Sequence, residues 1–211
     1  AKEYPKDSNI PNDISKLKLK FIGLIGFIDP PKDNIRSYIS TCKKAGIKVV
    51  MITGDNGITA SAIASEVGIP SSKVITGEML EKMSLEELQE SVTDCAIFSR
   101  VLPKHKKKII TAYQNIGHIV AMTGDGVNDA AALKQANIGI AMGSGTDVAK
   151  DASSMILTDD NFVSIVNAVA VGRTVYDNIK KSIGYLFSGN LGAIITIVFA
   201  LVMNWASPFT A

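Results

Sequence analysis

Residues 122–129 read Met-Thr-Gly-Asp-Gly-Val-Asn-Asp and follow an apolar stretch, Ile119 to Met122, that is typical of a buried β-strand. Ligands of parallel sheets gather at the carboxyl ends of the strands, where this loop would lie. Its glycines let a ligand approach the backbone closely. Asp125, Asn128 and Asp129 supply hard oxygen atoms of the kind that Mg²⁺ prefers. The stretch therefore predicts a site for Mg²⁺ and phosphate, and an Asx-rich turn that caps a helix is the alternative.

The end of a second expected strand carries the same three residues, Thr-Gly-Asp. Ile47 to Ile52 is another buried-type strand, and Thr53-Gly54-Asp55 follows it. The hydroxyl of Thr53 can donate a hydrogen bond to a phosphoryl oxygen, and a neighbouring backbone N–H can add another. One such triplet also fits an ordinary β-turn, but two of them at strand ends in one small domain indicate a shared site.

A basic segment supplies a candidate cation for that site. Residues 103–108 read Pro-Lys-His-Lys-Lys-Lys and are expected to begin a helix, because proline is tolerated in a first helical turn. A lysine here can neutralise phosphate charge. Spacing alone does not select Lys106, and a solvated basic face is the simpler interpretation for Lys104, Lys107 and Lys108.

Short apolar runs alternate with helical patterns along the rest of the chain, which predicts an α/β fold with a parallel sheet and helices on both faces. The expected strands are Leu19 to Ile28, Ile47 to Ile52, Val74 to Ile75, Cys95 to Ser99, Ile119 to Met122, Ile138 to Met142 and Met155 to Leu157. The expected helices include Asn34 to Ala45, Thr59 to Val67, Ser84 to Gln89, Pro103 to Asn115 and a long one from Asp160 onward.

Composition narrows the class of protein. The chain has 211 residues, a formal net charge of +2 and 46% hydrophobic residues. This balance argues against a dedicated nucleic-acid binder, which carries a strong basic excess, and against a disordered chain. Cys42 and Cys95 lie outside any metal-ligand spacing and are expected to be free thiols. His105 and His118 are expected at the surface or beside strands, not as metal ligands.

The C-terminal part of the chain has a different character. Ile183 to Trp205 is mostly apolar, and no Asp, Glu, Lys or Arg follows Lys181. About 20 such residues span a bilayer. Lys180 and Lys181 before the stretch, with a tryptophan at its far end, match a helix that leaves the cytoplasm. We therefore expect an integral membrane protein with residues 1–175 in the cytoplasm, and a buried core helix is the alternative.

Taken together, these residues resemble the haloacid dehalogenase-like (HAD) superfamily and, more closely, the P-type cation-transporting ATPases of the calcium-pump-like branch. The resemblance is collinear from about Lys20 to the C-terminus. The stretches that carry it are Asp29-Pro30-Pro31, residues 51–56, residues 100–106, residues 123–130, residues 138–146, Asp159-Asp160-Asn161-Phe162, and Gly172-Arg173 with Tyr176 and Asn178.

The resemblance implies a HAD-like Rossmannoid sheet followed by a long helix that runs into the membrane. Residues 1–175 would be the phosphorylation domain without its nucleophile strand, and residues 1–18 the tail end of the nucleotide-binding domain and hinge. Residues 176–211 would be the stalk and the fifth transmembrane helix. The implied partners are the nucleotide-binding and actuator domains and the other transmembrane helices of the same pump, the transported cation and the lipid bilayer, with no nucleic acid.

The family's roles transfer onto matching positions of this chain. Asp125 would bind Mg²⁺, ATP would be the phosphoryl donor, and Asp129 would support the loop and Lys106. The residues that would contact the transferred phosphoryl group are Thr53, Gly54, Lys106 and Asn128. The candidates for holding the nucleotide are Asp55, Arg100 and Lys32. Lys32 stands where the family commonly has arginine, so it keeps the charge but loses the bidentate geometry.

One family motif does not occur in the chain. The phosphorylated aspartate lies in an Asp-Lys-Thr-Gly-Thr motif, and no such stretch is found here. The resemblance therefore implies part of a larger pump that forms and hydrolyses an aspartyl-phosphate, with the chain inactive by itself. A soluble HAD-type phosphatase is one alternative, but it needs an Asp-x-Asp nucleophile, which is also missing. A non-catalytic, degenerate pump fragment that binds nucleotide or a partner is the other.

The apolar stretch also bears on the transported ion. Asn190 is a candidate ligand of that cation, because uncharged polar groups in a membrane span are costly unless they serve packing or an ion pathway. Its alternative role is a hydrogen bond between helices. Ala193 falls where sarcoplasmic-type calcium pumps and sodium–potassium pumps carry a glutamate that plasma-membrane-type calcium pumps lack. The resemblance therefore points to Ca²⁺, with fewer ions bound per cycle.

Overall fold

The computed structural model describes residues 13, 19–26 and 30–206, and the chain divides into two units, Ala1–Lys32 and Asp33–Ala211. In the first unit, residues 19–26 form neither helix nor strand, and Phe21 and Leu24 are 78% and 91% exposed. The strand expected from Leu19 was therefore wrong over these residues, and its last two positions lie outside the described part. A strand forms only where its backbone N–H and C=O groups find a neighbour, and the described residues of this unit supply none.

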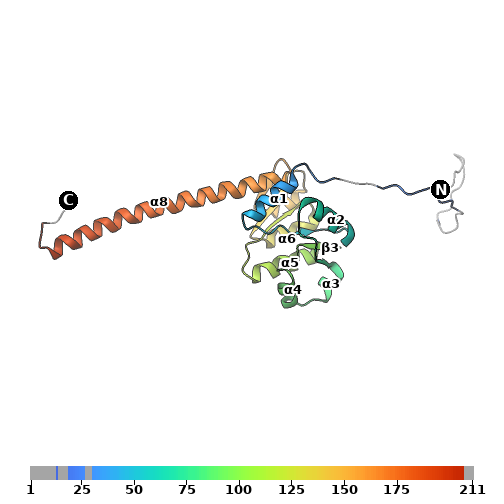
Figure 1. Cartoon of the computed structure of the whole chain (residues 1–211), viewed down its shortest axis with the longest axis horizontal. Coiled ribbons are helices and arrows are strands. Elements are labelled where there is room, and N and C mark those ends of the chain that lie inside the picture. The colour runs from blue at the N-terminus through green and yellow to red at the C-terminus, as the bar shows by residue number, and fades with distance from the viewer. Residues whose placement is uncertain (1–12, 14–18, 27–29, 207–211) are drawn as a thin grey trace. The chain divides into compact units, whose positions relative to one another are not determined.

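The second unit is an α/β structure (Figure 1). Its strands are β1 (Met51–Ile52), β2 (Val74–Thr76), β3 (Ile97–Ser99), β4 (Ala121–Gly124), β5 (Ile138–Met142) and β6 (Met155–Leu157). Its helices are α1 (Ile35–Lys44), α2 (Gly57–Val67), α3 (Gly77–Lys82), α4 (Leu85–Ser91), α5 (Pro103–Asn115), the 3₁₀ turn η2 (Val127–Asp129), α6 (Ala130–Gln135), α7 (Asp147–Asp151) and α8 (Phe162–Val202).

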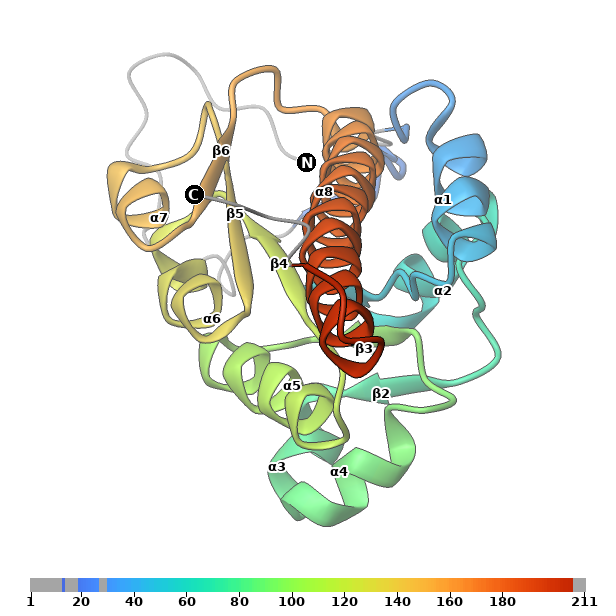
Figure 2. The same cartoon turned by 90° about the vertical axis from the view of Figure 1, so that its left-hand side faces the viewer.

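All the strand pairs in this unit are parallel, which confirms the predicted fold class. The strands form two sheets of three, in the orders β1-β3-β2 and β4-β5-β6. Figure 2 shows the second sheet beside α6 and α7. The sequence indicated one sheet, and the structure differs because β1 and β4, among the described strands, each pair on one side only. Both strands that lead into the Thr-Gly-Asp triplets therefore have an open edge.

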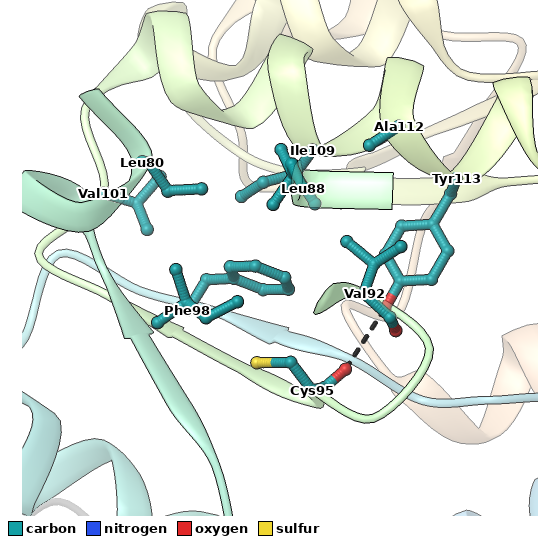
Figure 3. Close-up of a cluster of buried hydrophobic side chains, with 10 residues drawn as sticks. Leu80, Leu88, Val92, Cys95, Phe98, Val101, Ile109, Ala112 and Tyr113 are labelled. Atoms are coloured by element: carbon teal, nitrogen blue, oxygen red, sulfur yellow. Dashed lines mark hydrogen bonds between the residues drawn. The ribbon is translucent and has the colours of Figure 1, made fainter. Parts of the chain in front are cut away.

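Side chains of β3 alternate between two apolar clusters, because successive residues of a strand point to opposite faces. Phe98 joins the cluster under α3, α4 and α5 (Figure 3). Ile97 joins the cluster under α1 and α2. The hydroxyl of Tyr113 closes the first cluster by donating to the carbonyls of Val92 at 3.0 Å and Cys95 at 3.3 Å. The predicted helices on both faces are thereby confirmed.

Several helices begin and end at residues that cap helices. Ser84 and Glu87 form the expected capping box at the start of α4. Asn56 accepts the N–H of Thr59 at 2.9 Å and so begins α2, which ends at Gly68 with a φ of 86°. The N-cap of α2 follows directly after the first Thr-Gly-Asp triplet, so the end of β1 and the start of α2 fix this loop from both sides.

Helix α8 is uninterrupted over 41 residues and is long and apolar enough to cross a membrane. Only 6% of its most apolar window is buried, so the alternative of a buried core helix was wrong. Its first turn packs on the protein through Phe162, and Arg173 donates to the carbonyl of Ala45 at 2.8 Å. The expected boundary at residue 175 falls inside this helix and stays a prediction.

Candidate functional site

The loop after β1 is fixed by its own hydrogen bonds and by β3. Thr53 donates its backbone N–H to Phe98 at 2.9 Å and accepts from Val101 at its carbonyl at 3.1 Å. The Thr53 hydroxyl accepts the backbone N–H of Asp55 and donates to its carboxylate, both at 3.1 Å. The triplet is therefore a closed turn at the end of β1, with Thr53 partly exposed and Asp55 exposed.

The glycines of the two triplets have different surroundings. A Cβ on Gly124 would lie 2.5 Å from the Cβ of Asp129, so packing against that aspartate requires glycine. A Cβ on Gly54 would meet no atom within 4 Å. Packing within the described residues therefore does not require glycine at position 54, and the expected contact of Gly54 with a phosphoryl group stays a prediction.

Asp129 and Lys106 form a buried ion pair beside the second triplet. Turn η2 carries Asp129 inward, where the residue is 6% exposed. Its Oδ1 accepts the ammonium of Lys106, and its Oδ2 accepts the backbone N–H of Asp125 at 3.4 Å. A carboxylate this deeply buried needs such partners. The structure thus brings α5 to the Asp125 loop, although the role of Lys106 toward a phosphoryl group stays a prediction.

The other lysines of α5 have different surroundings. Lys104 pairs with Glu81 of α3, and Lys107 is exposed. Lys108 donates to the carbonyl of Leu80 at 2.7 Å and also to a carbonyl just past the end of α3. The interpretation of Lys108 as a solvated residue was therefore wrong, because it holds the C-terminal end of α3.

Asp125 and Asn128 project from the loop after β4 and are exposed. The carbonyl of Asp125 accepts the N–H of Thr146 at 2.8 Å, which ties the loop to the turn after β5. Across the described part of the chain, no group of three or more His, Cys, Asp or Glu side chains could hold a metal ion. One exposed carboxylate with an adjacent amide fits Mg²⁺ only if phosphate or another carboxylate completes the shell, which is how this cation is usually bound.

Arg100 and Asp55 meet through the backbone. Arg100 has a φ of 49° and donates its N–H to the carbonyl of Asp55 at 2.9 Å. It lines two open hollows of about 740 and 510 Å³, one at the start of α2 and one beside α3.

Lys32 belongs to the first unit, and Asn190 lies in the C-terminal half of α8. Their predicted roles toward nucleotide and transported cation stay predictions.

His105 was predicted at the surface or beside a strand, and this was wrong, since it lies inside α5 and is 3% exposed. Its Nδ1 accepts the N–H of Leu102 at 3.2 Å, and its Nε2 donates to Glu81 at 2.9 Å. Glu81 lies 24 positions earlier in the chain, so spacing could not reveal the contact. The one local signal was Leu102, a helix N-cap whose side chain cannot accept a hydrogen bond. Cys42 and Cys95 are free, as predicted.

Comparison with protein families identifies this arrangement. Residues 5–137 match the family model of haloacid dehalogenase-like hydrolases, and residues 106–169 match a second model of the same description. The chain belongs to the haloacid dehalogenase-like hydrolase family. Both strand-end loops, at Thr53 and at Asp125, lie within the matched residues 5–137 and follow strands of two different sheets.

Curated relatives of this haloacid dehalogenase-like chain are calcium-transporting ATPases. The chain is 62% identical over 195 residues to calcium-transporting ATPase 1 of Lactococcus lactis, covering 92% of this chain and 22% of that protein. It is 57% identical to a calcium-transporting ATPase of Listeria monocytogenes over 96% of this chain and 24% of that protein. It therefore spans less than a quarter of each relative's length.

Two solved structures of ATPases are also similar to this chain. A zinc-transporting PIB-type ATPase is 30% identical, with a TM-score of 0.61 over 85% of this chain and 24% of that one. The catalytic domain of the CPx-ATPase CopB-B is 27% identical, with a TM-score of 0.51 over 66% of this chain and 45% of that one. The similarity to P-type ATPases that the sequence predicted is therefore confirmed.

Proposed function

We propose that the chain is the phosphorylation-domain part of an ATP-driven pump that forms and hydrolyses an aspartyl-phosphate with Mg²⁺ to transport Ca²⁺. The observation that carries this proposal is the Lys106–Asp129 ion pair, which places a cation beside the Asp125 loop. The names of the relatives at 57–62% identity support Ca²⁺ as the ion.

The open edges of β1 and β4 support a place for the missing nucleophile. Both strands are parallel members of sheets that stop at these edges, and both lead into Thr-Gly-Asp triplets. A further parallel strand, supplied by the rest of the pump, would satisfy the backbone groups along both edges at once. Its carboxyl end would then bring the phosphorylated aspartate between Thr53 and Asp125.

The residues at this site fit phosphoryl transfer, which depends on positioning and charge stabilisation. The Thr53 hydroxyl, which donates to Asp55 in this structure, would turn to a phosphoryl oxygen. Asn128 supplies a further donor, and Lys106 supplies positive charge. Asp129 holds the Lys106 ammonium in place from behind. Asp125 would hold Mg²⁺, which neutralises phosphate charge when bound. Asp55, Arg100 and Lys32 are the residues that we propose for binding ATP.

Helix α8 supports the membrane part of the proposal. We place residues 1–175 on the cytoplasmic side and the apolar part of α8 in the bilayer, with Asn190 as a ligand of the cation. The contacts of Phe162 and Arg173 join the start of α8 to the rest of the unit. They offer a route by which movement of the phosphorylated domain reaches the membrane. A soluble phosphatase would have no use for so exposed an apolar helix.

The test is transport by the full-length protein that contains this chain, reconstituted in sealed vesicles. ATP with Mg²⁺ is expected to drive ⁴⁵Ca²⁺ uptake that a calcium ionophore releases. Vesicles that hydrolyse ATP faster in the presence of another cation, and take up that cation instead, would overturn the Ca²⁺ assignment. Vesicles with neither activity would overturn the proposed function.

A further inference from the structure

The first turn of α5 contains a buried histidine that the proposed mechanism does not use. His105 precedes Lys106 directly and is 3% exposed. Its Nδ1 accepts the N–H of Leu102 at 3.2 Å, and its own N–H donates to the carbonyl of Leu102 at 2.9 Å. The two bonds run in opposite directions between the same residues. They close the start of the helix, as the third-position glutamate does in a capping box.

The start of α5 depends on His105 because the side chain of the N-cap residue forms no hydrogen bond. Leu102 is the N-cap of α5 and makes no side-chain capping bond. The first N–H groups of a helix have no partner within the helix, and a serine, threonine, asparagine or aspartate at the N-cap usually supplies one. His105 instead fixes the conformation of the N-cap from inside the helix.

The ring is held at its other nitrogen as well. Because Nδ1 accepts a hydrogen bond, Nε2 carries the ring proton and donates it to Glu81 Oε1 at 2.9 Å. The hydrogen bonds from Lys104 and from His105 hold the pKa of Glu81 below its ordinary value, so Glu81 is a charged acceptor at neutral pH. A Cβ on Gly77 would lie 3.3 Å from Nδ1 and would collide with the Arg100 carbonyl. Helix α3 therefore packs closely against the ring.

Lys106 is the next residue along the helix and turns away from α3. Neighbouring positions of an α-helix differ by about 100° around the axis. With His105 fixed toward Glu81, the Lys106 side chain points to Asp129 on the other side. We propose that His105 is a positioning residue for Lys106: it sets the start and the rotation of α5, and so directs the lysine to the phosphoryl site. The proposal rests on the proposed function, and His105 itself contacts no reacting group.

The experiment is a double-mutant cycle in the full-length protein, with the rate of phosphoenzyme formation from ATP as the readout. His105→Leu removes both ring hydrogen bonds and is expected to slow this step roughly tenfold to a hundredfold, the cost of misplacing a catalytic group. The KM for ATP should change by less than about threefold, because the change acts on the transition state. In a Lys106→Ala background, His105→Leu should cost no further rate, since no lysine remains to be directed.

Two variants serve as controls. His105→Asn keeps an acceptor near the place of Nδ1 and should recover most of the lost rate. His118→Leu removes the exposed histidine beyond the other end of the same helix and should keep the full rate.

Three results overturn the proposal. They are a full rate in His105→Leu, an equal loss in both backgrounds, and no recovery in His105→Asn. If His105→Leu does not fold, the cycle is run with His105→Ala, which also removes both ring hydrogen bonds and must lose rate only where Lys106 is present. A parent protein that forms no phosphoenzyme refutes the proposed function first, so the two failures are distinguishable.

Discussion

At the scale of single residues, the two strand-end glycines differ in what surrounds them. Gly124 has no room for a side chain, since a Cβ would lie 2.5 Å from Asp129, whereas Gly54 faces open space. Gly124→Ala should therefore lower the melting temperature and displace Asp129. Gly54→Ala should change the free energy of unfolding by less than about 0.5 kcal/mol and still slow phosphorylation. Thermal unfolding and phosphorylation rates of the two variants check this, and a normal rate in Gly54→Ala would contradict a ligand at that loop.

Lys106 tests the ion pair. Lys106→Ala removes a charge from the phosphoryl site and should slow phosphoryl transfer roughly 100-fold or more. It also leaves the buried Asp129 carboxylate without its cation, which should destabilise the protein by about 3 kcal/mol. Stopped-flow phosphorylation and chemical denaturation measure the two effects. Lys107→Ala, at an exposed position of the same helix, is the matched control and should change neither. Equal effects of the two substitutions would move the role away from Lys106.

At the scale of secondary-structure elements, α5 is clamped between α3 and η2. Glu81 of α3 binds Lys104 and His105, and Lys108 binds carbonyls at the end of α3. The opposite side of the helix reaches Asp129 through Lys106. The position of Lys106, which we propose for the phosphoryl site, therefore depends on α3, a helix to which we assign no site residue.

The pKa of Glu81 gives this clamp a pH dependence. The hydrogen bonds from Lys104 and then His105 lower that pKa from its ordinary value of 4.5. A lowered pKa in the folded state stabilises the protein above the unfolded pKa, and this stabilisation is lost as the pH falls through the folded value. Glu81→Gln should therefore lower the melting temperature at pH 7, and the difference from the parent should shrink below pH 4.5. A difference that stays constant to pH 3 would contradict a role for the charge.

Elements could be predicted from the sequence where they depend on residues that are close together in the chain. The capping box of Ser84, the glycine at the end of α2 and the strand at Ile138 needed only neighbouring residues to be found. Prediction failed where the structure depends on contacts between residues that are far apart in the chain. Residues 19–26 read as a strand, but a strand needs a partner that its own sequence does not contain. His105 read as a surface residue because the helix that buries it, α3, was not predicted.

At the scale of the whole molecule, two sheets with open edges and one long apolar helix fit our proposal that the chain acts within a larger pump. The chain spans 22% of its Lactococcus relative, and we assign the nucleophile strand to the open edges of β1 and β4. We therefore propose that the site residues of this chain surround a group that the rest of the pump supplies.

Asn190 tests the function of α8 at this scale. Asn190→Ala should lower the apparent affinity for Ca²⁺ roughly tenfold or more, because it removes one oxygen ligand of the ion. Calcium titration of phosphoenzyme formation in membranes measures the effect. Thr196→Ala is the matched control, since the Thr196 hydroxyl already donates to the Gly192 carbonyl of its own helix at 2.8 Å. An unaltered affinity in Asn190→Ala would remove Asn190 from the ion pathway.

The most direct test of the aspartyl-phosphate site is the level of acid-stable phosphoenzyme that the full-length protein forms from ATP and Mg²⁺. Asp125→Asn should reduce this level roughly 100-fold or more, because the site loses the one exposed carboxylate that we assign to Mg²⁺. Asp94→Asn, at an exposed position after α4, should leave it unchanged. A normal phosphoenzyme level in Asp125→Asn, with the usual dependence on Mg²⁺, would contradict the central claim that the loop after β4 is the metal-binding half of the site.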